Sequence, residues 1–134
     1  RFPTITHKLK RFVALKTMER DATVPARNID VDYAISACWL MPRTAYQAVG
    51  LLDENIFYSP EDVDYCVRMW LAGKRICYVP SAVVIHDAQE LSRGDKISKF
   101  TLSHAKGLLY FFGKHGYWFR RQSLVRRFPI PPAA

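Results

Sequence analysis

The sequence has no run of apolar residues long enough to cross a membrane. A spanning helix needs roughly 18 to 20 consecutive apolar residues, and every apolar run in these 134 residues is shorter. The N-terminal residues also lack the apolar core of a signal peptide. We therefore expect a chain that is not itself a membrane span.

Cysteine is also scarce. The three cysteines, Cys38, Cys66 and Cys77, include no close pair and no CxxC metal motif. Each lies within an apolar run, so the sequence predicts buried, reduced thiols instead of disulfides or a zinc site. This pattern favours a reducing compartment, and we expect a cytoplasmic location.

Composition and charge limit the remaining possibilities. With 49% hydrophobic residues, the chain can bury one core and forms one domain or part of one. Its net charge of +8 predicts an anionic partner: nucleic acid, a membrane surface or a phosphorylated substrate. The basic residues crowd both ends while the acids lie in the middle, which disfavours a continuous nucleic-acid groove.

Apolar patterns predict strands alternating with helices. Strands are expected over residues 33–41, 76–79 and 82–85. Helices are expected over residues 43–49, 61–72 and 100–112, with a basic amphipathic helix within 1–20. Loops are expected over residues 21–32, 51–58 and 88–97. This order of elements indicates the α/β class.

Carboxylates crowd the start of the predicted helix at 61–72. Glu61, Asp62 and Asp64 occupy three of its first four positions. Backbone NH groups and the helix dipole stabilise anions there, so these acids have a purely structural explanation. A carboxylate beside an aromatic loop is also suited to take a proton from a bound substrate. The spacing alone leaves both interpretations open.

Five segments in a fixed order point to a family. They are residues 34–43 (AISACWLMPR), 48–54 (AVGLLDE), 61–68 (EDVDYCVR), 72–73 (AG) and 78–86 (YVPSAVVIH). Together they resemble the C-terminal half of family-two glycosyltransferases, and within these the bacterial rhamnosyltransferase-like enzymes of cell-surface polysaccharide synthesis. The resemblance implies a GT-A fold. It also implies inverting transfer of a sugar from a nucleotide-sugar to a hydroxyl of a glycan or a lipid-linked acceptor.

The resemblance assigns roles to individual residues. It implies that Asp62 is the general base and that His86 is a ligand of the divalent metal, Mg or Mn, which carries the donor diphosphate. These roles suit the chemistry, because the attacking hydroxyl needs a base and the leaving diphosphate needs positive charge. Acceptor contacts or loop support are expected for Glu61, Asp64, Arg68, Ser36 and Trp39. A salt bridge or helix cap is the favoured explanation for Asp64.

The chain also departs from the family pattern. The N-terminal nucleotide-binding half, with its Asp-x-Asp metal motif, is not recognised upstream of Tyr33. Residues 30–32 and 62–64 have the bare Asp-x-Asp pattern, but neither follows a predicted strand. We therefore expect a fragment that is inactive alone, with a metal bound only when the donor half is present. Ser36 replaces a usual glycine, which leaves the sugar preference open.

Three regions are expected along the chain. Residues 1–29 form a basic N-terminal helix and loop, residues 30–97 the acceptor-side catalytic half-domain, and residues 98–134 a C-terminal helix with a basic aromatic tail. The run at 117–121 (YWFRR) either packs on the domain or docks on an anionic membrane. The second option predicts peripheral attachment at the inner face of the cell membrane.

Two alternatives to an enzyme remain open at this stage. One is a non-catalytic remnant that serves as an interaction domain, which the unrecognised donor half keeps in play. The other is a basic nucleic-acid-binding module. The acidic middle of the chain argues against the second alternative, so we expect no nucleic-acid partner.

Overall fold

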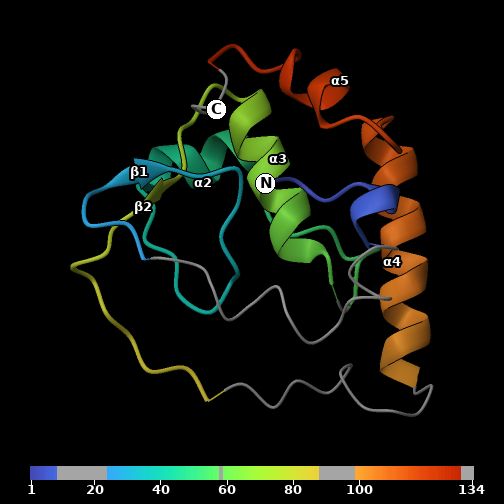
Figure 1. The fold of residues 1–134 in the computed structure, drawn as a ribbon, viewed down its shortest axis with the longest axis horizontal. Coiled ribbons are helices and arrows are strands. Elements are labelled where there is room, and N and C mark those ends of the chain that lie inside the picture. Colours follow the sequence, from blue (N-terminus) through green and yellow to red (C-terminus); the bar gives the residue numbers. More distant parts are fainter. Residues whose placement is uncertain (9–23, 58, 88–98, 131–134) are drawn as a thin grey trace.

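The computed structural model describes residues 1–8, 24–57, 59–87 and 99–130 and is mainly helical (Figure 1). Its elements are β1 (Ile29–Asp30), α2 (Arg43–Val49), α3 (Glu61–Leu71), β2 (Cys77–Tyr78), α4 (Lys99–His115) and α5 (Arg121–Val125). Residues 5–8 form a further helical turn. Strands β1 and β2 pair antiparallel, with Ile29 opposite Tyr78. Helices and strands both occur, as the α/β class requires, but each described strand has only two residues.

Proline and glycine bound the helices as the sequence predicts. Helix α2 begins after Pro42 and ends at Gly50, whose φ of +80° suits glycine. Helix α3 ends just before Gly73, which has a φ of +69°. The predicted helices at 43–49 and 61–72 are confirmed, and α4 contains the one predicted at 100–112. None of the described helices is long and apolar enough to span a membrane.

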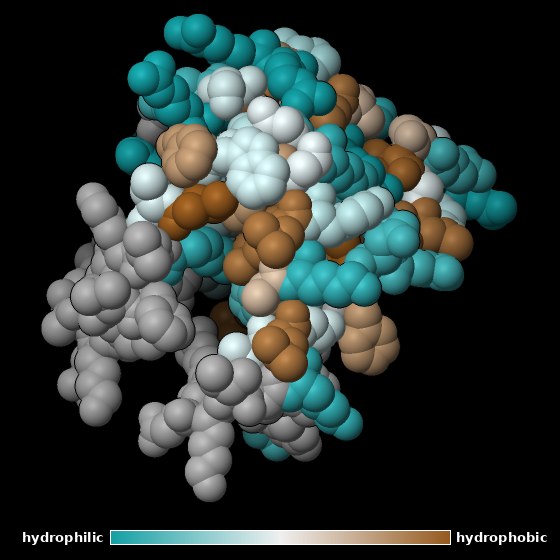
Figure 2. All heavy atoms as spheres, turned by 90° about the vertical axis from the view of Figure 1, so that its right-hand side faces the viewer, coloured by the Kyte–Doolittle hydropathy of each residue, from teal (hydrophilic) through white to brown (hydrophobic). Residues whose placement is uncertain are grey.

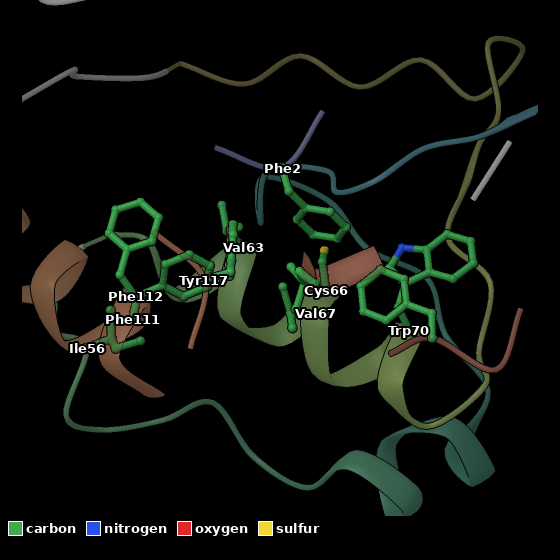
Figure 3. Packing of buried hydrophobic residues seen from close by; sticks show 11 residues of the cluster. Phe2, Ile56, Val63, Cys66, Val67, Trp70, Phe111, Phe112 and Tyr117 are labelled. Atoms are coloured by element: carbon green, nitrogen blue, oxygen red, sulfur yellow. The ribbon is translucent and has the colours of Figure 1, made fainter. Parts of the chain in front are cut away.

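Helix α3 lies at the centre of the molecule and supplies most of its core (Figures 1 and 3). Val63, Cys66, Val67 and Trp70 are buried in this core, as predicted, while Tyr65 and Met69 of the same helix are buried in a second cluster with Ala45. The Trp70 ring stacks on Phe128 with centroids 5.9 Å apart, and its Nε1 donates a hydrogen bond to the Asp32 carbonyl at 2.9 Å. The indole is therefore fully buried without an unpaired donor.

Aromatic side chains of α4 close the other end of this core. Figure 3 shows Phe111, Phe112 and Tyr117 near Val63, at the opposite end of the cluster from Trp70. Phe111 and Phe112 each meet Tyr117 edge to face, with centroids 5.7 and 5.6 Å apart. Such pairs favour this geometry because the positive ring edge meets the negative ring face.

Two predicted strands are wrong. Residues 33–41 and 82–85 have no strand geometry, and Leu40 and Ile85 within them are fully exposed. A strand needs a neighbour to satisfy its backbone hydrogen bonds, and no described strand pairs with either segment. The third predicted strand, at 76–79, forms only as the two residues of β2.

Other expectations also need correction. Only Cys66 is buried, and burial raises the pKa of its thiol to about 12; Cys38 and Cys77 are free and exposed. In the loop at 51–58, Ile56 packs into the core, but Phe57 is 84% exposed. Most of the predicted N-terminal helix and of the loop at 88–97 lies outside the described residues.

A buried carboxylate joins α3 to α4. Asp64 is 0% exposed, and its carboxylate accepts a hydrogen bond from Arg68 Nε at 2.9 Å. Lys114 Nζ and His115 Nε2 each lie 2.8 Å from its Oδ1. Burial alone would raise the pKa of Asp64, but the hydrogen bonds from His115 and Lys114 outweigh it and hold the pKa below its usual range. The charge is therefore compensated inside the protein.

Arg68 and Lys114 extend this network to the loop after α2. The Arg68 guanidinium donates to the carbonyl oxygens of Val49 and Leu51, each at 2.9 Å. Lys114 Nζ also lies 2.6 Å from Asp53 Oδ2. The segment at 49–53 is therefore tied to both α3 and α4.

Helix α4 approaches the loop before α3 most closely at Gly107. A Cβ on Gly107 would overlap the carbonyl oxygen of Ser59 and lie 3.4 Å from Cγ2 of Ile56. The missing side chain permits this approach. Gly113, in the same helix, has no atom within 4 Å of the position that a Cβ would take.

Replacement of Gly107 by alanine should lower the free energy of unfolding by about 1 to 3 kcal/mol, because the new methyl group overpacks against backbone. Gly113→Ala is the matched control. It should leave stability unchanged or raise it by up to ~1 kcal/mol, since alanine favours the helix more than glycine. Urea unfolding followed by circular dichroism measures both; equal effects would contradict the close packing at Ser59.

Asp64→Asn should lower the free energy of unfolding at pH 7 by roughly 3 kcal/mol, because it removes the buried charge that Arg68, Lys114 and His115 pair with. The folded pKa of Asp64 lies below its usual range. Its stabilisation is therefore present above the unfolded pKa and is lost as the pH falls through the folded pKa. Urea midpoints at pH 7 and pH 3 should show a smaller difference between wild type and variant at pH 3. A difference that does not depend on pH would contradict this account.

Candidate active site

The three acids at the start of α3 have different environments. Asp64 points into the interior and pairs with cations, whereas Glu61 and Asp62 are half-buried. Glu61 Oε2 accepts a hydrogen bond from the Ser59 NH at 2.5 Å, and Asp62 Oδ1 accepts one from the Val63 NH at 2.7 Å. The carboxylates that remain accessible to a ligand are therefore Glu61 and Asp62.

Burial raises the pKa of both accessible carboxyls. The hydrogen bond within Glu61 opposes this shift, while the negative charge of Asp62 adds to it. For Asp62, the Val63 NH and the positive charge of Lys8 oppose the effect of burial. A carboxylate with a raised pKa is a stronger base, and such perturbed groups cluster at functional sites.

Two adjoining clefts involve the loop before α3. The first, of about 320 Å³, lies between the segment at 54–57 and α4. The second, of about 250 Å³, is lined by the segment at 52–57 and by Glu61. Glu54 and Phe57 line both clefts, so the two adjoin. Glu61 thus faces a cleft, whereas Asp62 lines neither of them.

The other predicted acceptor contacts do not converge on this place. Arg68 belongs to the Asp64 network and also lies 4.8 Å from the centroid of the Tyr65 ring. Trp39 is half-buried and stacks on the same Tyr65 ring, with centroids 5.5 Å apart. Ser36 lies exposed in a turn. None of these three predicted residues lines either of the two clefts.

The described residues do not form a metal site by themselves. His86 is exposed, and no group of three His, Cys, Asp or Glu side chains in the described part of the chain is placed to hold a metal. Asp30 and Asp32 pair with Arg75 and Arg121 at 2.8 and 2.5 Å. The sequence predicts no strand before this pair of aspartates, but Asp30 ends β1. The metal role of His86 therefore stays a prediction.

The sequence analysis missed the contribution of α4. Its polar residues recur every three or four positions and so share one side of the helix. They are Ser103, Lys106, Tyr110 and Lys114. This side meets the loop before α3, since Tyr110 Oη and Lys114 Nζ both donate to Asp53 Oδ2. The spacing of these polar residues could have been read from the sequence, but the contact of α4 with the loop before α3 could not.

The aromatic-basic run at 117–121 is divided between core and surface. Tyr117 is 1% exposed, and the guanidinium of Arg121 pairs with Asp32. Phe119 and Arg120 between them are exposed. Packing therefore accounts for Tyr117 and Arg121, while docking of the exposed residues on a membrane stays a prediction.

This chain is similar to known proteins. The family model described as "Glycosyltransferase like family 2" matches residues 3–103. N-acetylglucosaminyl-diphospho-decaprenol L-rhamnosyltransferase of Mycobacterium tuberculosis is 33% identical over 90 residues, which are 67% of this chain and 29% of that protein. Rhamnosyltransferase WbbL of Escherichia coli is 35% identical over 63 residues, 47% of this chain and 24% of that protein. The pre-mycofactocin glycosyltransferase of M. tuberculosis is 44% identical over 57 residues, 42% of this chain and 12% of that protein.

The matches have two limits. The chain spans less than a third of the length of these relatives. No solved structure matched it.

The family model covers most of the chain, including β1, α2, α3 and β2. A match to this family implies a GT-A-like α/β fold, of which the described residues contain few strands. The resemblance to rhamnosyltransferases is also confirmed by the named relatives. The chain belongs to glycosyltransferase family 2.

Proposed function

We propose that the protein transfers a sugar from a nucleotide-sugar to a hydroxyl of a cell-surface glycan or lipid-linked acceptor, with inversion at the anomeric carbon. This chain supplies the acceptor side of the active site. One observation carries the proposal: two half-buried carboxyls with raised pKa values, Glu61 and Asp62, begin α3, and Glu61 lines the second of two adjoining clefts. Relatives named as rhamnosyltransferases support the transfer of a sugar.

Asp62 is the general base in this mechanism. Its carboxylate takes the proton of the acceptor hydroxyl while that oxygen attacks the anomeric carbon. The bond from the anomeric carbon to the nucleoside diphosphate breaks, and its electron pair leaves with the phosphate oxygen. Attack opposite the leaving group inverts the configuration. The positive charge of Lys8 opposes the effect of burial and favours the ionised form that a base requires.

Glu61 holds the acceptor in the same mechanism. Its side chain lines the second cleft, and its hydrogen bond from the Ser59 NH fixes it against the loop. A carboxylate so placed accepts hydrogen bonds from sugar hydroxyls. Asp64 stays outside the chemistry, because Arg68, Lys114 and His115 occupy it.

The donor diphosphate requires groups beyond the described residues. A Mg or Mn ion would supply positive charge to the leaving diphosphate, but His86 alone cannot hold it. The described residues thus do not form a complete metal site, and removal of the acceptor proton by Asp62 does not require one. We accordingly expect this chain by itself to be inactive.

We place the protein at the inner face of the cell membrane as a peripheral protein. Trp118, Phe119 and Arg120 lie at the surface just after α4. Aromatic rings favour the membrane interface, and arginine favours anionic head groups. On the side of the molecule that carries α4, apolar side chains are interspersed with hydrophilic ones (Figure 2), which suits a local contact more than a broad apolar face.

Asp62→Asn in the full-length protein should reduce the rate of sugar transfer by about 10² to 10⁴ while donor binding is unchanged, because only the base is lost. Glu61→Gln is the matched control on the neighbouring residue. It should raise the KM for the acceptor with a smaller loss of kcat. Initial rates with a panel of nucleotide-sugars test both variants. Full turnover by Asp62→Asn would show that Asp62 is not the general base. If kcat fell in Glu61→Gln but not in Asp62→Asn, Glu61 would be the base.

The stability of Asp62→Asn distinguishes a catalytic carboxylate from one that stabilises the helix. Because the folded pKa of Asp62 is raised, its ionised form destabilises the fold above the unfolded pKa, and protonation relieves this as the pH falls. Asp62→Asn should therefore leave the melting temperature at pH 7 unchanged or raise it. A clear decrease, of the kind expected for Asp64→Asn, would support the structural interpretation instead.

A further inference from the structure

We propose that the first cleft, between residues 54–57 and α4, is a subsite for an uncharged sugar ring of the acceptor. This inference rests on the proposed function and adds a substrate class and a place of binding to it. The cleft is lined by Glu54, Asn55, Phe57, Ser103, Lys106 and Tyr110, with Gly107 between them. None of these residues has a role in the chemistry described above.

Phe57, like Glu54, lines both this cleft and the one that reaches Glu61. Its ring is 84% exposed, although the neighbouring Ile56 is buried at 3%. A single exposed aromatic residue is ordinary on a protein surface. Phe57, however, lines both clefts, so a ligand that occupies either one meets the ring. Aromatic rings offer a large, rigid apolar surface at little loss of conformational entropy, which suits the C–H face of a sugar ring.

Polar groups around the ring match the hydroxyls of a sugar. The side chains of Glu54, Ser103 and Lys106 have no hydrogen-bond partner among the residues that the structure describes. They supply a carboxylate acceptor, a hydroxyl that both donates and accepts, and an ammonium donor. Small-ligand sites typically combine apolar surface with a few such groups. The cleft's volume of about 320 Å³ lies at the lower end for these sites, which favours a ring-sized ligand.

The charges favour an uncharged ligand over a phosphate. Lys106 contributes the one cationic group that lines this cleft, and Glu54 lies on the same cleft with the opposite charge. The adjoining cleft adds the carboxyl of Glu61 and that of Asp53, which Lys114 pairs from outside the cleft, and no cation lines it. A diphosphate would therefore meet more negative than positive charge here. Sugar hydroxyls accept hydrogen bonds from the ammonium and donate them to the carboxylates without this repulsion.

The walls of the cleft are held in place before a ligand binds. Asp53 accepts hydrogen bonds from Asn55 Nδ2 at 2.8 Å, from Tyr110 Oη at 3.1 Å and from Lys114 Nζ at 2.6 Å. Gly107 lets α4 contact the carbonyl of Ser59 at the base of the same loop. A preformed site loses less entropy on binding than a mobile one. A ring in this cleft would lie next to the cleft lined by Glu61, the neighbour in sequence of the proposed base.

The test is the acceptor dependence of transfer by the full-length protein. Phe57→Ala should raise the KM for the acceptor by roughly three- to tenfold, as expected for loss of an aromatic contact. Its kcat and its KM for the donor should stay within about twofold, because the ring binds the acceptor in ground and transition state alike. Phe57→Trp should restore the acceptor KM. Tyr46→Ala, which removes an exposed aromatic residue that lines neither cleft, is the matched control.

A binding measurement separates this inference from the proposed function. Saturation-transfer NMR with neutral oligosaccharides detects contact without turnover, and the signal should be lost in Phe57→Ala and in Lys106→Ala but retained in Tyr46→Ala. Equal acceptor KM and equal NMR contact in Phe57→Ala and wild type would overturn the subsite. Stronger competition by inorganic diphosphate than by neutral saccharides would overturn the uncharged ligand. Wild-type protein that binds saccharide through Phe57 but transfers no sugar from any donor would support the subsite and overturn the proposed function.

Discussion

A buried negative charge determines how the parts of this molecule fit together. Asp64 is completely enclosed, and its compensation comes from its own helix and from the end of α4. A buried carboxylate without its partners is far less stable than one with them, so the elements that carry those partners are held in one arrangement. The clefts take their shape from this arrangement, because their walls belong to α4 and to the loop that Arg68 and Lys114 bind.

The three acids at the start of α3 have pKa values shifted in opposite directions by their surroundings. Cations lower the pKa of Asp64, while burial without an adequate partner raises the pKa values of Glu61 and Asp62. Enzymes commonly separate the roles of acidic groups in this way. One turn of α3 thus contains both a charge that is paired inside the protein and two carboxyls that remain accessible.

Local signals in the sequence predicted the helices, because proline and glycine act through their own backbone. Strands depend on partners far along the chain, and those expected at 33–41 and 82–85 have none among the described strands. For the site, the acids and the family were visible in the sequence. The contact of His115 with Asp64 was not, since 51 residues separate them and no local pattern encodes that distance. The clefts were missed for the same reason.

The order in which the core is completed has a consequence for synthesis of the protein. Helix α3 precedes the rings of Phe111, Phe112 and Phe128 that cover it, and Asp32 meets Arg121 only 89 residues later. A ribosome releases the N-terminal part of a chain first. The apolar face of α3 therefore emerges only partly covered, by earlier residues such as Phe2 and Ile56, and stays so until α4 and α5 have been made. A pause in synthesis between β2 and α4 would lengthen this exposure and favour aggregation of the nascent chain.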